Sequence, residues 1–212
     1  MPNDLQSPFV TGHCTPNGAR LRLVAVSIAY PLLALVLGVL VWALLWQLLC
    51  TINNFCGVDR HWLGKNLIVG VEVVAQLTAA WQIAAPLTPA AWRWICSLAV
   101  AVILVIGVQD LPDVAGDRLR GRRTLPIALG DTATRAYLCL VFTALPLVLN
   151  VVLIVPAGLN WWPVTVGTTL TALSFVVATR ALLLRTPAQD RRTYRLTELM
   201  YTLLLATSIT LL

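Results

Sequence analysis

Long apolar stretches separated by short polar ones dominate this chain. The apolar stretches cover about 16–55, 66–85, 90–108, 136–155, 163–184 and 194–212. A helix that crosses a bilayer needs about 20 predominantly apolar residues, so each stretch after the first has the length of one membrane span. The pattern therefore predicts an all-α, polytopic transmembrane helical bundle.

The first apolar stretch is long enough for two short-looped helices or for one long tilted helix, and Gly38 is a plausible turn point. Basic residues decide between these alternatives. With two helices there are about seven spans, and all but Arg93 of the 15 basic residues fall on one side. With one helix, Arg20 and Arg22 would lie opposite the next basic loop. We therefore predict seven spans, with the basic side in the cytosol.

Composition agrees with a membrane protein. Hydrophobic residues make up 58% of the chain and charged residues 11%, whereas soluble domains carry about 25% charged residues. We expect residues 1–212 to form a single domain, integral to the lipid bilayer. The excess of basic residues falls in membrane loops, so it does not indicate nucleic-acid binding. The five cysteines have neither metal-site nor disulfide spacing, and protein partners are not predicted.

One charged segment, Gln109–Leu129, interrupts the apolar pattern. It contains three carboxylates and four arginines: Asp110, Asp113, Asp117, Arg118, Arg120, Arg122 and Arg123. In a helix, spacings of three and four residues place the carboxylates on one face. Mg²⁺ commonly bridges such carboxylates to substrate phosphates, and arginines bind phosphate oxygens. The alternative is a solvated loop whose arginines contact the inner leaflet and whose aspartates balance them.

The segment also carries a resemblance to a known family. QDLPDVAGDRLRGRRTLPIALG resembles the second aspartate-rich motif of the UbiA family of intramembrane prenyltransferases. Two other stretches are similar to that family, SPFVTGHCTPNGA from Ser7 and DRHWLGKNLIVG from Asp59. The sequence of these stretches is most similar to fungal members of the family, which include meroterpenoid prenyltransferases and terpene cyclases. The resemblance implies that the chain corresponds to the third through ninth helices of a nine-helix fold.

The family's first motif, Asn-x-x-x-Asp-x-x-x-Asp, precedes the region that this chain resembles. Asp4 alone does not supply three carboxylates. The resemblance therefore implies an N-terminally truncated sequence or a degenerate member. Since the family divides its metals between two aspartate clusters, it also implies weak metal–diphosphate binding and little turnover by these 212 residues alone.

The family mechanism implies Mg²⁺-dependent transfer of an isoprenyl group from an isoprenoid diphosphate to an acceptor within the membrane. The alternatives are a UbiA-type terpene cyclase and an inactive remnant. By resemblance, Asp113 and Asp117 are the main metal ligands. Asp110 is either a further metal ligand or a residue that contacts one of the ligands. The expected diphosphate contacts are Arg60, Lys65 and Arg118. Arg122 and Arg123 are expected to be structural or lipid-facing.

The isoprenyl group or acceptor needs its own contacts. Asn53, Asn54 and Phe55 end a span near the cytosolic side, where they would contact the substrate or complete a helix end. Aromatic faces stabilise carbocations, and five aromatic residues are candidates for such a pocket or for lipid packing: Trp42, Trp46, Phe55, Trp81 and Tyr137. Glu72 lies within a span, and Gln76, one turn away, is a possible partner.

Overall fold

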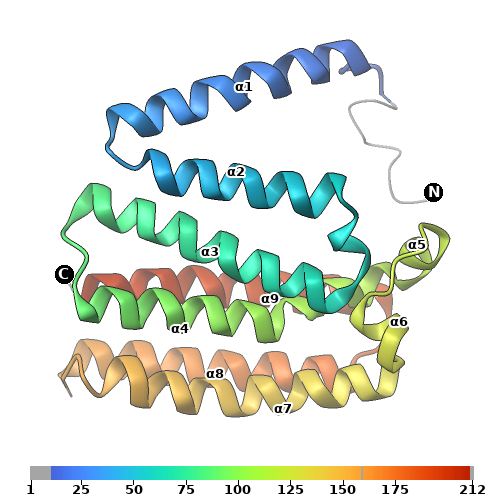
Figure 1. The fold of residues 1–212 in the computed structure, drawn as a ribbon. Helices are drawn as coiled ribbons and strands as arrows, with labels where there is room; N and C mark the ends of the chain where they lie inside the picture. The colour runs from blue at the N-terminus through green and yellow to red at the C-terminus, as the bar shows by residue number, and fades with distance from the viewer. Residues whose placement is uncertain (1–10, 159, 211–212) are drawn as a thin grey trace.

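The computed structural model describes residues 11–158 and 160–210, with the side chains of 209 and 210 excepted, and these residues are almost entirely helical. Asp4 and Ser7, which bear on the family resemblance, lie outside this range. The long helices are α1 (Pro16–Val36), α2 (Leu40–Phe55), α3 (Trp62–Ala84), α4 (Pro89–Val105), α7 (Asp131–Leu149), α8 (Trp161–Leu183) and α9 (Pro187–Ala206) (Figure 1). The short helical segments are η1 (Val58–Arg60), η2 (Ile106–Asp113), α5 (Val114–Leu119), α6 (Leu125–Leu129), η3 (Asn150–Ile154) and η4 (Thr207–Thr210).

These long helices confirm the predicted all-α membrane bundle. Five helical stretches are long and apolar enough to cross a membrane: α1, α3, Pro89–Leu119, Asp131–Ile154 and α8. The remaining two predicted spans correspond to α2, which is apolar but has 16 residues, and to α9, which begins with a charged turn. The break between α1 and α2 falls at Gly38, whose φ of 74° favours glycine.

Helix starts differ from the apolar pattern because capping residues set them. α3 begins at Trp62, four residues before the apolar stretch, because the His61 side chain accepts a hydrogen bond from the backbone N–H of Leu63. α9 begins at Pro187, where the Thr186 side chain accepts from the backbone N–H of Gln189. A side-chain acceptor at the N-cap satisfies a free N–H, and proline suits the first helical position.

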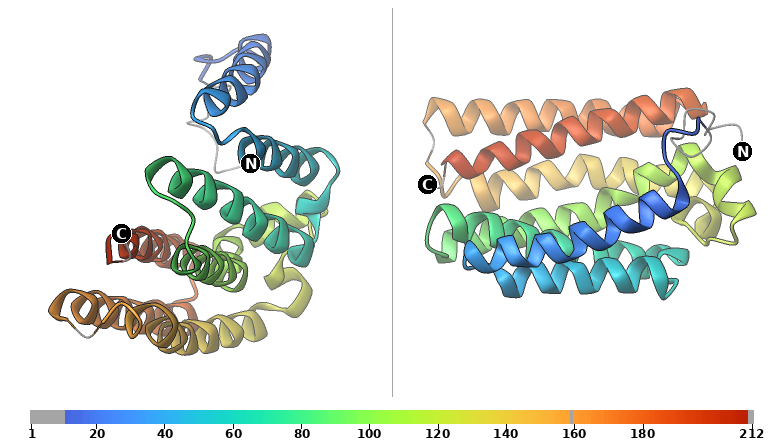
Figure 2. Two further views of the ribbon diagram at one scale, coloured as in Figure 1. Left: turned by 60° about the vertical axis from the view of Figure 1, so that its left-hand side comes forward. Right: turned by 90° about the horizontal axis from the view of Figure 1, so that it is seen from above.

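Successive long helices run in opposite directions, so the connections alternate between two ends of the bundle (Figure 1). The η1 connection, the α5–α6 region and the α8–α9 turn lie at one end, and the other turns lie at the opposite end. Figure 2 shows α1 and α2 on the outside, away from α7 and α8. This alternation brings the basic loops together, as the charge pattern predicted.

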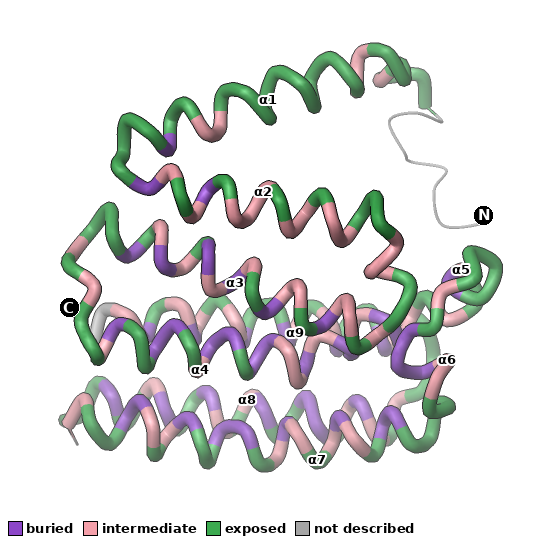
Figure 3. The backbone as a smooth tube through the Cα atoms, in the orientation of Figure 1, coloured by how far each residue is buried: buried purple, intermediate pink, exposed green. Residues whose placement is uncertain are grey.

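The core lies between α4, α7, α8 and α9. Leu98, Leu138, Phe142 and Val177 are fully buried there. Burial falls off towards the N-terminal helices (Figure 3): 61% of the apolar window in Pro89–Leu119 is buried, against 6% in α1. The outer helices therefore present apolar side chains where a bilayer would surround them, and the aspartate-rich segment sits at one end of the better-packed half.

Candidate active site at the aspartate-rich segment

The aspartate-rich segment, Gln109–Leu129, does not continue α4 as a regular α-helix. The chain tightens into the 3₁₀ helix η2, which contains Pro112, and then forms α5. Proline cannot donate a backbone hydrogen bond, so it weakens a regular helix at this point. A turn at Gly121, with φ 68°, then leads back towards α6.

The three carboxylates do not converge on one face. Asp110 and Asp117 are buried, with exposed fractions of 4% and 5%, whereas Asp113 is exposed. Asp113 has φ −114° and ψ 13°, outside helical values, so the regular angular spacing is interrupted there. Among the described residues, no three His, Cys, Asp or Glu side chains lie close enough to hold a metal ion together. One uninterrupted helix would have placed the carboxylates together, and this arrangement corrects that expectation.

Two cations from different segments neutralise the buried carboxylates. The Lys65 ammonium, in the first turns of α3, lies 2.5 Å from Oδ1 of Asp110. The Arg122 guanidinium donates to Oδ2 of Asp59 at 2.6 Å, and its other terminal nitrogen lies 3.5 Å from Oδ1 of Asp117. Arg122 is therefore a structural bridge, in agreement with its predicted role. Lys65 was predicted to contact a diphosphate; in this structure it pairs with Asp110.

Backbone hydrogen bonds join the same two segments. The N–H of Arg123 donates to the carbonyl of Arg60 at 2.6 Å, and the N–H of Trp62 donates to the carbonyl of Arg123 at 3.0 Å. A short parallel bridge between His61 and Arg123 results. The η1 connection and the aspartate-rich segment are therefore in direct contact, whereas the charge pattern predicted only that they share one side of the membrane.

The two other predicted diphosphate contacts remain available. The Arg60 and Arg118 side chains are exposed, and neither makes an ion pair within the described part of the chain. Both lie on segments at the same end of the bundle. Exposed guanidinium groups beside buried carboxylates suit a ligand that carries both a metal ion and an anion.

The chemistry of the donor atoms fits Mg²⁺. Oδ2 of Asp110 is buried and has no hydrogen-bond partner, which is costly for a carboxylate oxygen unless a cation approaches it. The exposed Asp113 carboxylate has no ion pair among the described residues. Mg²⁺ prefers oxygen ligands and is usually bound by one or two carboxylates plus substrate phosphates, so a complete protein cage is not required.

The predicted substrate contacts at the end of α2 behave differently from one another. The amide of Asn54 donates to the Cys50 carbonyl at 2.8 Å, which favours its helix-end alternative. Phe55 is 77% exposed, so it lines no enclosed pocket. Asn53 is half-buried, and its amide oxygen has no partner. Of these three residues, Asn53 therefore has a buried polar atom that a ligand could satisfy.

The candidate aromatic residues do not form one pocket. Trp42 donates to Gln82, Trp81 packs against Trp94, and the Tyr137 hydroxyl donates to the Leu104 carbonyl at 2.9 Å. Trp46 contacts Tyr30 edge to face. These contacts favour the packing alternative, because each ring is engaged with its own neighbouring residue on an adjacent helix. The aromatic pocket proposed from the sequence is not assembled by these residues.

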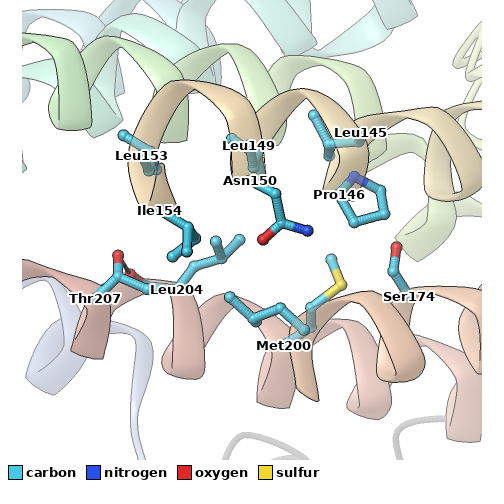
Figure 4. Close-up of a pocket in the computed structure, with 11 residues that line it drawn as sticks. Leu145, Pro146, Leu149, Asn150, Leu153, Ile154, Ser174, Met200, Leu204 and Thr207 are labelled. Carbon is cyan, nitrogen blue, oxygen red and sulfur yellow. Dashed lines mark hydrogen bonds between the residues drawn. The ribbon is translucent and has the colours of Figure 1, made fainter. Parts of the chain in front are cut away.

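A small cavity lies elsewhere, between the end of α7, α8 and α9 (Figure 4). Its volume is about 20 Å³ and its lining is mostly apolar, including Leu145, Leu153 and Met200. This space holds about one water molecule. Because the cavity lies at the far end of α7 from the aspartate-rich segment, it is separate from the candidate active site.

Sequence reasoning missed one buried ion pair. Arg135 and Asp190 are almost fully buried and lie 2.9 Å apart in two parallel hydrogen bonds. Arg135 was predicted to be a loop charge. The available signal was Asp190, an acidic residue in the first turn of α9 directly before Arg191 and Arg192.

Glu72 also has a different neighbour from the predicted one. The Cys50 thiol of α2 lies beside its carboxyl group, whereas Gln76 is exposed. A residue one turn away on the same helix was the only partner that the sequence spacing identified. The observed neighbour, Cys50, belongs to the adjacent helix, and its identity depends on how α2 and α3 pack.

Comparisons with known proteins identify the family. The model of the UbiA prenyltransferase family matches residues 1–205. The chain is 50% identical to Somaliensene A/B synthase of Streptomyces somaliensis, covering 95% of this chain and 68% of that protein. It is 32% identical to Diterpene cyclase eriG of Hericium erinaceus, covering 96% and 65%, and 33% identical to Polyprenyl transferase eriF of the same fungus, covering 69% and 51%.

The predicted family is confirmed, but the expectation that the sequence is most similar to fungal members is wrong, because the bacterial relative is 50% identical and the two fungal relatives are 32% and 33% identical. The chain spans about half to two thirds of the length of these proteins. No solved structure matches. Its apolar helices and these matches show that the chain is an integral membrane protein that belongs to the UbiA prenyltransferase family.

Proposed function

We propose that this chain, as one membrane domain, takes part in the Mg²⁺-dependent ionisation of an isoprenoid diphosphate. The observation that carries the proposal is the meeting of carboxylates and cations from two segments at one end of an apolar bundle. Members of the matched family generally use Mg²⁺ with diphosphate substrates. An apolar bundle offers the isoprenoid chain a water-poor environment, while its polar end receives the diphosphate. We place that end in the cytosol.

The carboxylates hold the metal in this proposal. Asp113 and Asp117 are the main ligands, and the unpartnered Oδ2 of Asp110 supports its role as a third. Bound Mg²⁺ would neutralise charge that develops on the leaving diphosphate. Because no three ligating side chains lie together in the described part of the chain, substrate phosphate oxygens would be needed to complete the coordination.

The cations orient the diphosphate. The exposed guanidinium groups of Arg60 and Arg118 are suited to bidentate contacts with phosphate oxygens, whereas Lys65 supplies a compact charge. When the allylic C–O bond breaks, both electrons remain with the diphosphate oxygen and the carbon becomes an allylic cation. Positively charged side chains at this oxygen would stabilise the charge it gains.

Two fates of the allylic cation are compatible with the family: alkylation of an acceptor, or cyclisation. The comparisons favour cyclisation. The relatives named as a synthase and a diterpene cyclase match 95% and 96% of this chain, whereas the polyprenyl transferase matches 69%. Cyclisation needs no second substrate, so the two fates differ in whether an acceptor is required.

Binding of a non-hydrolysable isoprenyl diphosphate analogue to the purified chain in lipid nanodiscs tests the proposal. We expect binding that requires Mg²⁺ and is abolished by the double change Asp113→Ala, Asp117→Ala. Arg93→Ala, at the opposite end, is the control and should bind normally. Analogue binding that survives the double change would contradict the proposal.

The products test the fate of the cation. Because little turnover is expected of these 212 residues alone, the assay uses a chain that also carries the family's first aspartate motif. With an isoprenoid diphosphate, Mg²⁺ and no acceptor, cyclisation predicts a cyclic hydrocarbon, detected by gas chromatography with mass spectrometry, and released diphosphate, detected by a phosphate assay after pyrophosphatase treatment. Diphosphate release that requires an added acceptor would instead show transfer.

A further inference from the structure

Lys65 and Asp110 form the closest charged contact at the candidate active site. Their atoms lie 2.5 Å apart, and their side chains are only 14% and 4% exposed. The second carboxylate oxygen, Oδ2, is buried and has no hydrogen-bond partner. The carboxyl group therefore has one oxygen neutralised by the protein's own ammonium and one oxygen left for a further cation.

A divalent cation at Oδ2 would lie close to the Lys65 ammonium on the other oxygen of the same carboxylate. Two positive charges this close repel each other strongly where little water screens them. Lysine carries its charge on a flexible four-carbon stem, so its ammonium can move to another acceptor. A diphosphate bound to the metal would supply that acceptor next to the site.

We infer that Lys65 is an exchangeable counter-ion: it holds Asp110 in the empty site and transfers to the diphosphate when the metal ion takes the carboxylate. The inference rests on the proposed function and adds a consequence to it. Without diphosphate, a metal ion must displace the Lys65 ammonium when no other acceptor is nearby. Without the metal ion, diphosphate must attract an ammonium that is already paired with Asp110. Each ligand therefore raises the affinity for the other by the same factor, as thermodynamic linkage requires.

Arg122 differs from Lys65 in this respect. Its shorter contact, 2.6 Å, is with Asp59, which lies outside the aspartate-rich segment, and its contact with Asp117 is 3.5 Å. A metal ion at Asp117 would leave Arg122 attached to Asp59. The exchange is therefore assigned to Lys65 alone.

The chain offers a direct probe, because Lys65 is its only lysine. Protein labelled with ¹³C at the lysine ε-carbon gives one side-chain signal, which can be followed in nanodiscs by NMR. We expect this signal to change little with Mg²⁺ alone or with inorganic pyrophosphate alone, and to shift when both are present. An unchanged Lys65 signal under conditions where both ligands bind would overturn the inference, while the proposed function would stand.

Variants test the coupling separately. In the wild type, Mn²⁺ affinity measured by electron paramagnetic resonance should rise about tenfold or more with inorganic pyrophosphate. Lys65→Met should bind Mn²⁺ alone more tightly than the wild type and should lose most of this rise. Lys65→Arg keeps the charge and should retain the rise, as should Arg93→Met. A full rise in Lys65→Met would overturn the inference. Absence of Mn²⁺ binding in the wild type, even with pyrophosphate, would overturn the proposed function as well.

Discussion

Arg135 and Asp190 join the N-terminal parts of α7 and α9 through a buried ion pair with two parallel hydrogen bonds of 2.9 Å. The same guanidinium donates to the Ala181 carbonyl near the end of α8. One side chain therefore fixes three helices at the end of the bundle that carries the candidate active site. Asp131, the other partner of Arg135, is half exposed, so its contribution is smaller.

Removing one member of this pair should destabilise the protein strongly. Arg135→Met leaves the Asp190 carboxylate buried without a counter-ion, and such a change costs about 3–5 kcal/mol. The double change Arg135→Met, Asp190→Leu removes both charges and should recover most of that loss. Thermal unfolding in detergent measures the effect, with Arg185→Met, an exposed residue, as control. A single variant as stable as the control would show that the pair does not hold the helices together.

The Arg122 bridge should control how firmly η1 is held against the aspartate-rich segment. Arg122→Gln removes the ion pairs to Asp59 and Asp117, so the backbone N–H groups of Trp62 and Arg123 should exchange with deuterium about five- to tenfold faster. That factor corresponds to about 1 kcal/mol, the scale of a partly exposed ion pair. Hydrogen exchange read by mass spectrometry measures it.

Arg123→Gln is the matched control for this prediction. The Arg123 side chain is exposed and has no ion pair in the described residues, since only its backbone joins the two segments. Equal exchange rates in both variants would mean that the backbone contacts do not depend on the Arg122 bridge.

Close helix packing makes Gly70 sensitive to substitution. A Cβ atom at this position would overlap the Ile103 side chain of α4. Gly70→Ala should therefore cost about 1–3 kcal/mol, as overpacking of a tight contact does. Gly116→Ala is the matched helical control, because no atom lies within 4 Å of a Cβ at that position. Thermal unfolding in detergent should show lower stability for Gly70→Ala than for Gly116→Ala. Equal stability of the two variants would contradict the close approach of α3 and α4.

Sidedness can be tested with the native Cys56, which is exposed beside η1. In a protein without the other cysteines, Cys56 should react with a membrane-impermeant maleimide from the cytosolic side. Leu119→Cys, in the aspartate-rich segment, should react from that side as well, because the two segments are in contact.

Asn160→Cys, exposed at the start of α8, should react from the other side. Sealed inside-out and right-side-out vesicles distinguish the two outcomes. Labelling of Cys56 and Leu119→Cys from opposite sides would refute the shared location, and labelling of both from the non-cytosolic side would reverse the orientation that we propose.

The sequence by itself determined the all-α membrane bundle, the two-helix solution for residues 16–55 and the gathering of basic loops at one end. Each of these follows from the order of apolar, basic and glycine residues along the chain. Of the seven spans that the sequence predicted, five helical stretches in the described part of the chain are long and apolar enough to cross a membrane. Span length follows from apolar run length, and the turn follows from Gly38, whose backbone conformation the structure confirms. The carboxylates of the candidate site were also identified, because their order along the chain carries the family resemblance.

Only the tertiary structure decided which charges meet. Spacing along one helix says which residues share a face, but it does not say which residue of another helix lies opposite. Lys65 pairs with Asp110, 45 positions away, and Arg135 pairs with Asp190, 55 positions away. The interruption at Asp113 likewise broke the one-face arrangement that helical spacing predicted. Partners of buried charges depend on the rotation and crossing of packed helices, and these are set by the whole bundle rather than by any single stretch of sequence.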